Sequence, residues 1–149
     1  MKIAAIAAAV AVLALLTGAN TTTTVSVSNE RRPLLSSSVV YVTCYEGLTQ
    51  RAPQSIPPGQ EIPFQLQPAA DGSGCFCVGK FSEFDEMGTP RYYIYDSRNG
   101  TGDHNYGQAR CESSFCRVKA NDTSFYGWNE GKKEWDIIMP KIWLPGSAP

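Results

Sequence analysis

The sequence has little of what nucleic-acid-binding, metal-binding and membrane-spanning proteins depend on. Its 13 basic and 14 acidic residues give a formal net charge of −1, which predicts neither a nucleic-acid partner nor strong attraction to an anionic membrane. It contains one histidine, His104, so no histidine-based metal site and no cofactor are expected. Beyond residue 16 no stretch is apolar and long enough to cross a membrane, and none has a convincing helical period.

The one long apolar run lies at the start of the chain. Lys2 precedes it, residues 3–16 are apolar, and small residues follow as far as Ala19. These features are typical of a secretory signal peptide that is cut after Ala19, and the run is too short for a comfortable membrane anchor, the alternative interpretation. We therefore expect residues 1–19 to be a signal peptide and residues 20–149 to form a single secreted, extracellular domain.

The rest of the chain has the pattern of a small all-β domain. Short alternating segments recur roughly every eight to twelve residues between turn-forming residues, as in a sandwich or barrel. Residues 75–81 and 91–96 are interpreted as a long central hairpin, and Pro63 predicts an edge position for its strand because it has no N–H donor. Residues 47–60 are expected to be a loop. Further strands are expected at 24–28, 39–45, 61–67, 110–120, 123–128, 134–139 and 142–144, which makes a disulfide-bonded β-sandwich of about eight strands.

Five cysteines follow the leader, and export makes disulfide bonds their expected state. The sequence alone does not choose among the possible connectivities. Pairing Cys44 with Cys116 and Cys77 with Cys111 would close long loops and stabilise the domain by about 4 kcal/mol for each bond. Cys75 is the cysteine expected to remain unpaired, either free or bonded between chains. The alternative, a zinc site on Cys75, Cys77, Cys111 and Cys116, is disfavoured by their spacing.

Two asparagines are candidates for N-glycosylation. Asn99 and Asn121 each begin an Asn-x-Thr acceptor pattern. Asn99 lies in the most exposed loop that the sequence predicts, so it is the better candidate. A third match, Asn20, would be the first residue of the mature chain and is the weakest.

The longest glycine-rich segment, residues 97–108, is the candidate recognition loop. It has no apolar period, and it carries Arg98, Asp103, His104 and Tyr106, which we interpret as partner-binding residues because loops on rigid scaffolds carry binding. The alternative is an unselected linker between strands. A hydrolase using His104 and nearby carboxylates is a further alternative, but no motif positions a nucleophile beside it, and we expect no catalytic residues and no enzymatic activity.

Several segments, in a fixed order, resemble the plant self-incompatibility S-protein family, the S-protein homologues. The resemblance covers nearly all of the mature chain. Its landmarks are a strand ending at Cys44, a Pro-Gly turn and alternating strand over 57–66, an aromatic-cysteine strand over 75–81, the sequence YYIYD at 92–96, a pair of cysteines within 111–118 and a C-terminal hairpin over 124–143.

The resemblance implies a secreted β-sandwich with two disulfides formed by Cys44, Cys77, Cys111 and Cys116. It also implies a non-enzymatic recognition or signalling protein whose partner is a membrane protein or glycan at a cell surface. The family includes stigma-secreted ligands that trigger self-rejection of pollen. The alternative is a secreted carbohydrate-binding or defence protein, antimicrobial or effector-like, because alternation leaves about half of its aromatic side chains outside the core.

Overall fold

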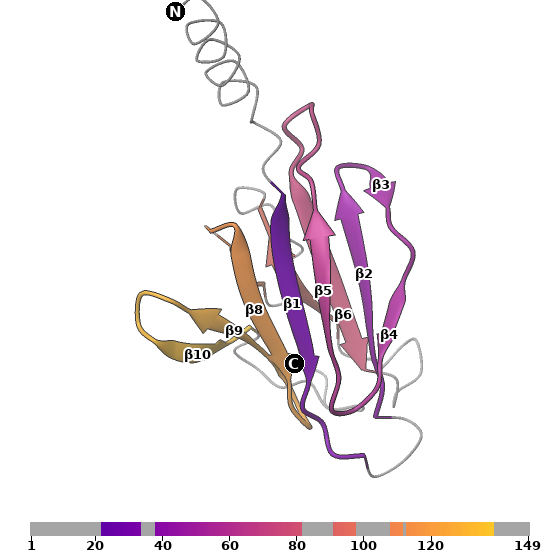
Figure 1. Ribbon diagram of the computed structural model, residues 1–149, viewed down its shortest axis with the longest axis vertical. Helices are drawn as coiled ribbons and strands as arrows, with labels where there is room; N and C mark the ends of the chain where they lie inside the picture. The colour runs from indigo at the N-terminus through magenta and orange to yellow at the C-terminus, as the bar shows by residue number, and fades with distance from the viewer. Residues whose placement is uncertain (1–21, 34–37, 82–90, 98–107, 112, 139–149) are drawn as a thin grey trace, which may run out of the picture.

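The computed structural model describes residues 22–33, 38–81, 91–97, 108–111 and 113–138. Within these ranges the chain is all-β, and its ten strands form two five-stranded sheets that lie against each other as in a sandwich (Figure 1). The expected all-β class is therefore confirmed, the arrangement of the sheets fits the expected sandwich, and the described residues form ten strands instead of about eight. The proposed signal peptide and the expected strand at 142–144 lie outside these ranges, and inside them no helix could cross a membrane.

Sheet A has the strand order β10-β9-β8-β1-β5. The first strand of the chain lies inside this sheet, parallel to β8 and antiparallel to β5. Figure 1 shows the β9–β10 hairpin projecting sideways from the rest of the sheet. The strands are β1 (Thr23–Asn29), β5 (Glu61–Leu66), β8 (Phe115–Ala120), β9 (Phe125–Asn129) and β10 (Glu134–Ile137). Pro63 lies on β5 at the sheet edge, as its missing N–H predicts.

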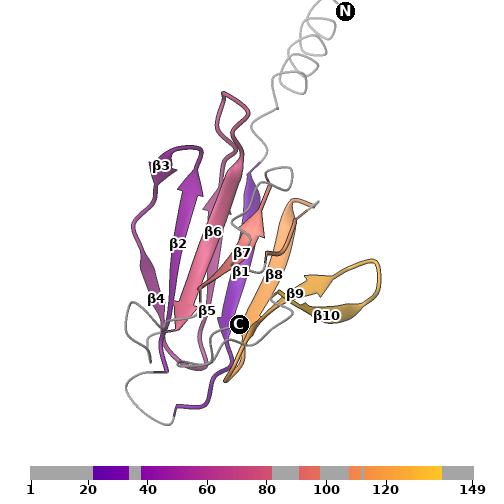
Figure 2. The same ribbon diagram turned by 180° about the vertical axis from the view of Figure 1, so that it is seen from behind.

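Sheet B contains the central hairpin. Its strands are β2 (Val40–Glu46), β3 (Thr49–Gln50), β4 (Gln54–Ile56), β6 (Cys75–Phe81) and β7 (Arg91–Asp96). The sheet B strands are in front in Figure 2. The predicted pairing of 75–81 with 91–96 is confirmed as β6 against β7, and β2 pairs with the other side of β6.

The prediction of a plain loop over residues 47–60 is wrong. β3 and β4 both pair with the free edge of β2, on the side away from β6. This pairing gives partners to backbone groups that a bare edge would leave unpaired, and it buries the side chain of Ile56 completely.

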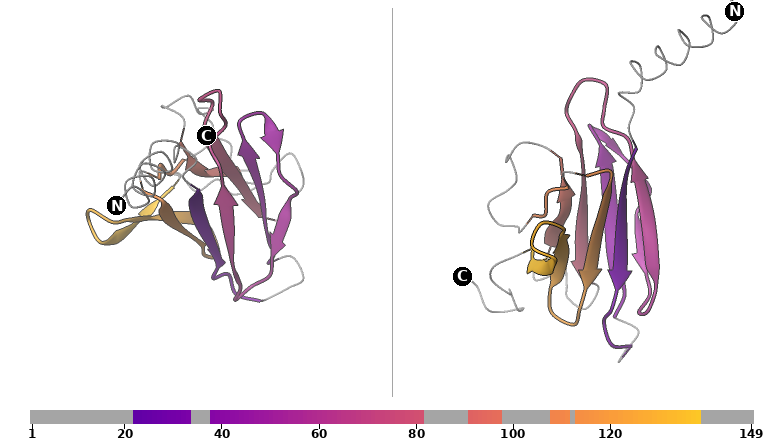
Figure 3. Two further views of the ribbon diagram at one scale, coloured as in Figure 1. Left: turned by 45° about the horizontal axis from the view of Figure 1, so that its top comes forward. Right: turned by 60° about the vertical axis from the view of Figure 1, so that its left-hand side comes forward.

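The alternation of each strand decides which side chains form the core. On β6, Cys75, Cys77, Gly79 and Phe81 are buried and the residues between them are half-buried, as the sequence predicts. Val25 and Val27 of β1 and Val40 and Val42 of β2 are also fully buried. Figure 3 shows the strands of the two sheets in two further views.

An aromatic cluster joins the two sheets. Phe125 of β9 stacks on Phe81 of β6 with ring centroids 4.8 Å apart, and it meets the ring of Tyr92 edge-on, also at 4.8 Å. Gly79 makes room for this contact, because a Cβ there would lie 2.8 Å from Phe125 Cζ and 2.5 Å from Ile94 Cδ1. The absence of a side chain at residue 79 therefore permits the rings of the two sheets to pack together at this cluster.

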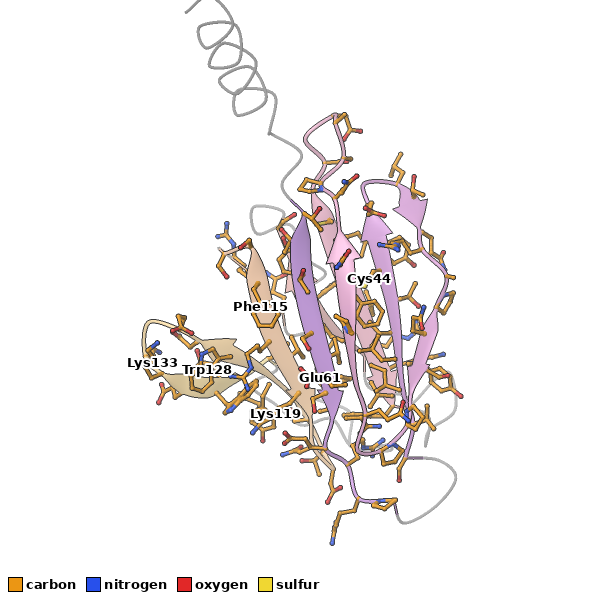
Figure 4. The ribbon with its side chains drawn as sticks, viewed as in Figure 1. Cys44, Glu61, Phe115, Lys119, Trp128 and Lys133 are labelled. Carbon is orange, nitrogen blue, oxygen red and sulfur yellow. A yellow bond between two sulfur atoms is a disulfide. The ribbon has the colours of Figure 1, made fainter. Side chains whose placement is uncertain are left out.

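Both disulfides use the four expected cysteines, but the pairing that we considered is wrong. Cys44 bonds to Cys77, its direct neighbour across β2 and β6, with Cα atoms 4.0 Å apart. Cys111 bonds to Cys116 at the start of β8. A Cys44–Cys116 bond would have joined opposite sheets, whereas the strand register already brings Cys44 and Cys77 together. Figure 4 labels Cys44.

We predict that the two disulfides differ in their contribution to stability. Replacing Cys44 and Cys77 with alanine should lower the free energy of unfolding by about 4 kcal/mol, and replacing Cys111 and Cys116 by about 2 kcal/mol, because the first bond closes a much longer loop. Urea denaturation of the two double variants tests this ranking. An equal or larger loss for the Cys111–Cys116 pair would contradict it.

Gly79→Ala should also destabilise the protein, by about 1–3 kcal/mol, because the added methyl group would overlap Ile94 and Phe125. Gly131→Ala is the matched control, since a Cβ at Gly131 meets nothing closer than 3.5 Å. Thermal unfolding of both variants measures the effect. A loss no larger for Gly79→Ala than for Gly131→Ala would show that the sheets can separate without cost.

Candidate functional site

The predicted recognition loop is described only at its two ends. Arg98, Asp103, His104 and Tyr106 lie outside the described residues, and so does the glycosylation candidate Asn99. The roles of these residues therefore stay predictions. Ser97 and the segment 108–111 show how the loop is attached to the domain.

Both ends of the loop are fixed to sheet B. The backbone N–H of Ser97 donates to the carbonyl of Cys75 (3.0 Å), and the Ser97 hydroxyl accepts from the Cys75 N–H (2.7 Å). At the other end, Ala109 donates its N–H to Tyr93 O (3.1 Å) and accepts from the N–H of Asp96 (2.9 Å). The loop thus leaves β7 and returns to the same strand, so its ends are held close together on a paired backbone.

Cys75 is free and completely buried below this attachment. Its Sγ lies 3.8 Å from Tyr95 Oη and 3.9 Å from Ser97 Oγ. Burial raises the pKa of the Cys75 thiol, so the unreactive protonated form is favoured. The suggested bond between chains through Cys75 would require the fold to open. The alternative zinc site does not hold either, because its three other cysteines are in disulfides.

A second candidate site is the outward surface of β8, β9 and β10, which we call the β8–β10 face. Register places Lys119 beside Tyr126, and Trp128 beside Trp135. The neighbouring residues Val118 and Phe125 point the other way, into the core. The outward side chains of the face are Phe115, Arg117, Lys119, Tyr126, Trp128, Trp135 and Ile137, and Figure 4 labels Phe115, Lys119 and Trp128 along these strands.

Two cations of this face lie over its aromatic rings. The Arg117 guanidinium carbon lies 5.2 Å from the ring centroid of Trp135 and 5.5 Å from that of Trp128. Lys119 Nζ lies 4.5 Å from the Trp135 ring, and the two indoles meet edge-to-face at 5.3 Å. Such contacts contribute about 0.5–2 kcal/mol each, so they hold the β9–β10 hairpin against β8.

The face also exposes large apolar side chains. Phe115 is 53% exposed and Ile137 is 40% exposed, whereas the indoles between them are half-buried. The sequence analysis considered the aromatic side chains only as a group, and it did not identify Phe115 and Ile137 as surface residues. The alternation of β8 could have shown that Phe115 points outward. Which strands lie beside β8, and so which side chains share its surface, could not be read from the sequence.

A hollow of about 760 Å³ adjoins the face, between the segment 108–111 and the β9–β10 hairpin. Its lining includes Arg110, Asp136 and the Cys111–Cys116 disulfide. Gly127 allows the segment to approach, because a Cβ there would lie 3.1 Å from Cβ of Ala109. The hollow thus connects the base of the recognition loop to the β8–β10 face.

Asn121, the second glycosylation candidate, lies in the turn before β9. Its Oδ1 accepts the N–H groups of Thr123 (3.0 Å) and Ser124 (2.9 Å), and its Nδ2 donates to Tyr126 Oη (3.2 Å). The side chain is half-buried and orders the turn. A glycan on Nδ2 would have to be accommodated beside Tyr126, and its presence stays a prediction.

No protein-family model matches this chain, and no curated protein matches it. The resemblance to S-proteins therefore depends on the sequence segments given above. The function has to be argued from the fold and from the two candidate sites.

The buried tyrosines predict a loss of stability at alkaline pH. Burial raises the pKa values of Tyr92 and Tyr95 to about 12, from 10.0 in the unfolded chain. Because the folded state holds the phenol protons more tightly than the unfolded chain does, these protons stabilise the folded state. This part of the free energy of unfolding is fully present below pH 10 and is lost as the pH rises from 10 to about 12. Urea denaturation at several pH values should show a steep fall in this window.

Between pH 10 and about 12, the free energy of unfolding of Tyr92→Phe should fall less than that of the parent protein. The Tyr92 hydroxyl has no hydrogen-bond partner among the described residues, so the variant should stay within about 1 kcal/mol of the parent protein at pH 7. Tyr41→Phe, at an exposed site on β2, is the matched control. An unchanged alkaline profile for Tyr92→Phe would contradict the prediction.

Proposed function

We propose that the protein is a secreted, non-enzymatic recognition or signalling protein that resembles the S-proteins and binds a cell-surface partner through the 97–108 loop. The observation that carries this proposal is the double attachment of the loop to β7 and to Cys75. A loop whose ends are fixed on a paired backbone loses less conformational entropy on binding than a freely hanging segment does.

The two disulfides support the extracellular part of the proposal. Disulfides persist in oxidising compartments and are rare in the cytosol. The leader at residues 1–19 has the composition of a secretory signal. Both observations favour a protein that acts outside the cell.

The composition of the loop supports the binding part. Arg98 and Tyr106 are of the residue types that dominate binding energy at protein interfaces, and Asp103 and His104 add charge and hydrogen-bonding groups. The partner proposed is a membrane protein or glycan at a cell surface.

Carbohydrate binding is the second candidate function. The β8–β10 face favours it, because exposed aromatic side chains lie there beside cations on a sheet surface. A secreted defence protein would also fit such a face.

Replacing residues 98–107 with a Gly-Ser segment of equal length should abolish partner binding and leave thermal unfolding unchanged, because the loop ends are held by Ser97 and Ala109. The measurement is saturable binding of labelled full-length mature protein to intact cells, with unlabelled protein as competitor. Leu48→Ser, at a site 97% exposed, is the control and should bind normally. Retained binding by the loop variant would reject the loop as the recognition site.

A further inference from the structure

Arg117 lies at the centre of the β8–β10 face and is presented in a particular way. Its guanidinium is within 5.5 Å of both indole centroids, Trp128 and Trp135. A cation–π contact does not consume the N–H donors of a guanidinium in hydrogen bonds to oxygen acceptors, so these donors can still bind an anion. A cation held in this manner is preorganised to bind a carboxylate with two parallel hydrogen bonds.

The nearby carboxylates have other partners. Glu130 is paired with Lys133 and also accepts a hydrogen bond from Trp128 Nε1 (2.8 Å). Glu30 Oε2 lies 3.8 Å from Lys119 Nζ. Arg117 thus lies over both indole rings. Hydrogen bonds from Lys133 and Trp128 lower the pKa of Glu130, and the charge of Arg117 contributes to this lowering. Glu30 is paired with Lys119 of the face itself, so Arg117 is the cation of the face with no ion pair among the described residues. The strongest recognition chemistry on this face is therefore directed at an anion.

Residues with hydroxyl groups lie on β1, next to the outward residues of β8. Register places Thr24, Ser26 and Ser28 of β1 directly alongside Phe115, Arg117 and Lys119 of β8. Ser26 is buried and donates its hydroxyl to Glu61 of β5, whereas Thr24 and Ser28 are half-buried and reach the surface. In Figure 4 Glu61 and Lys119 are labelled near one end of these strands, and Phe115 nearer the other.

These features together fit a chain of acidic sugars. The apolar C–H faces of sugar rings can pack on Phe115, Ile137 and the indoles. Sugar hydroxyls can bond to the hydroxyls of Thr24 and Ser28, and sugar carboxylates can pair with Arg117. We propose that the β8–β10 face binds an acidic polysaccharide whose sugar rings carry carboxylates. This inference rests on the second candidate function and does not involve the 97–108 loop.

Other anionic partners fit this face less well. Recognition of an anionic membrane typically uses clusters of about four to eight basic residues, and nucleic-acid binding uses many phosphate contacts. The outward positions of β8 contribute two cations, Arg117 and Lys119. Two well-placed cations between aromatic rings suit a ligand that combines a few carboxylates with apolar ring faces.

The test measures binding of the full mature chain to polygalacturonate by affinity electrophoresis. Carboxyl-reduced polygalacturonate, which has the same backbone without the charge, is the matched polymer. We expect binding to the acidic polymer that weakens as salt increases, and much weaker binding to the reduced polymer. Vesicles containing phosphatidylserine, used in the same buffer, distinguish lipid binding.

Three variants locate the binding site. Arg117→Gln should weaken binding about tenfold or more, because it removes a charge-assisted bidentate contact. Phe115→Ala, at an exposed position, should weaken it less and cannot disturb the core. Lys80→Gln is the control. Lys80 Nζ also lies over an aromatic ring, 5.7 Å from the centroid of Tyr41, but Lys80 belongs to β6 of sheet B, away from the β8–β10 face. This variant should bind normally.

Each other outcome overturns the inference. Equal weakening by Lys80→Gln would indicate diffuse charge attraction. Equal binding to the reduced polymer would reject the acidic ligand but keep carbohydrate binding. Binding to neither polymer, or to vesicles alone, would reject the inference that this face binds an acidic polysaccharide and would leave the loop proposal untouched. Circular dichroism shows whether Arg117→Gln is folded. If it is not, Phe115→Ala is the deciding variant, and normal binding of the acidic polymer by Phe115→Ala would reject the β8–β10 face as the binding site.

Discussion

The contact of Phe125 with Phe81 and Tyr92 is the interaction on which the rest of the structure depends. These three rings come from β9, β6 and β7 and join the two sheets through a space that Gly79 leaves open. β9 has core contacts on one side through Phe125 and outward contacts on the other through Tyr126 and Trp128. The position of the β8–β10 face is therefore determined by packing in the core.

The two candidate sites depend on different parts of this framework. The 97–108 loop is attached to the edge of sheet B, above the buried Cys75. The β8–β10 face belongs to the end of sheet A, and its cations are held by aromatic rings on the same strands. The hollow between the segment 108–111 and the hairpin lies where these two regions meet.

Most of the strands could be predicted from the sequence, because alternation is a local property and β1, β2, β5 and β6 show it clearly. β3 and β4 could not, because they are strands only by pairing with the edge of β2. The disulfide pairing depends on the register of β2 against β6, which composition does not determine. The β8–β10 face was missed because it is formed by strands whose side-by-side placement, next to β1, is not visible in a linear sequence.

The place of β1 has a consequence for how the chain assembles during synthesis. β1 is the first strand to be made, yet its two neighbours in sheet A, β5 and β8, come from residues 61–66 and 115–120. The β2–β6–β7 part of sheet B is complete once residue 96 has emerged, so its disulfide can form early. Sheet A must wait for β8, and long-range parallel pairing of this kind is slow. Until then one edge of β1 is open to other chains, so the nascent protein is most prone to aggregate just before its last strands appear.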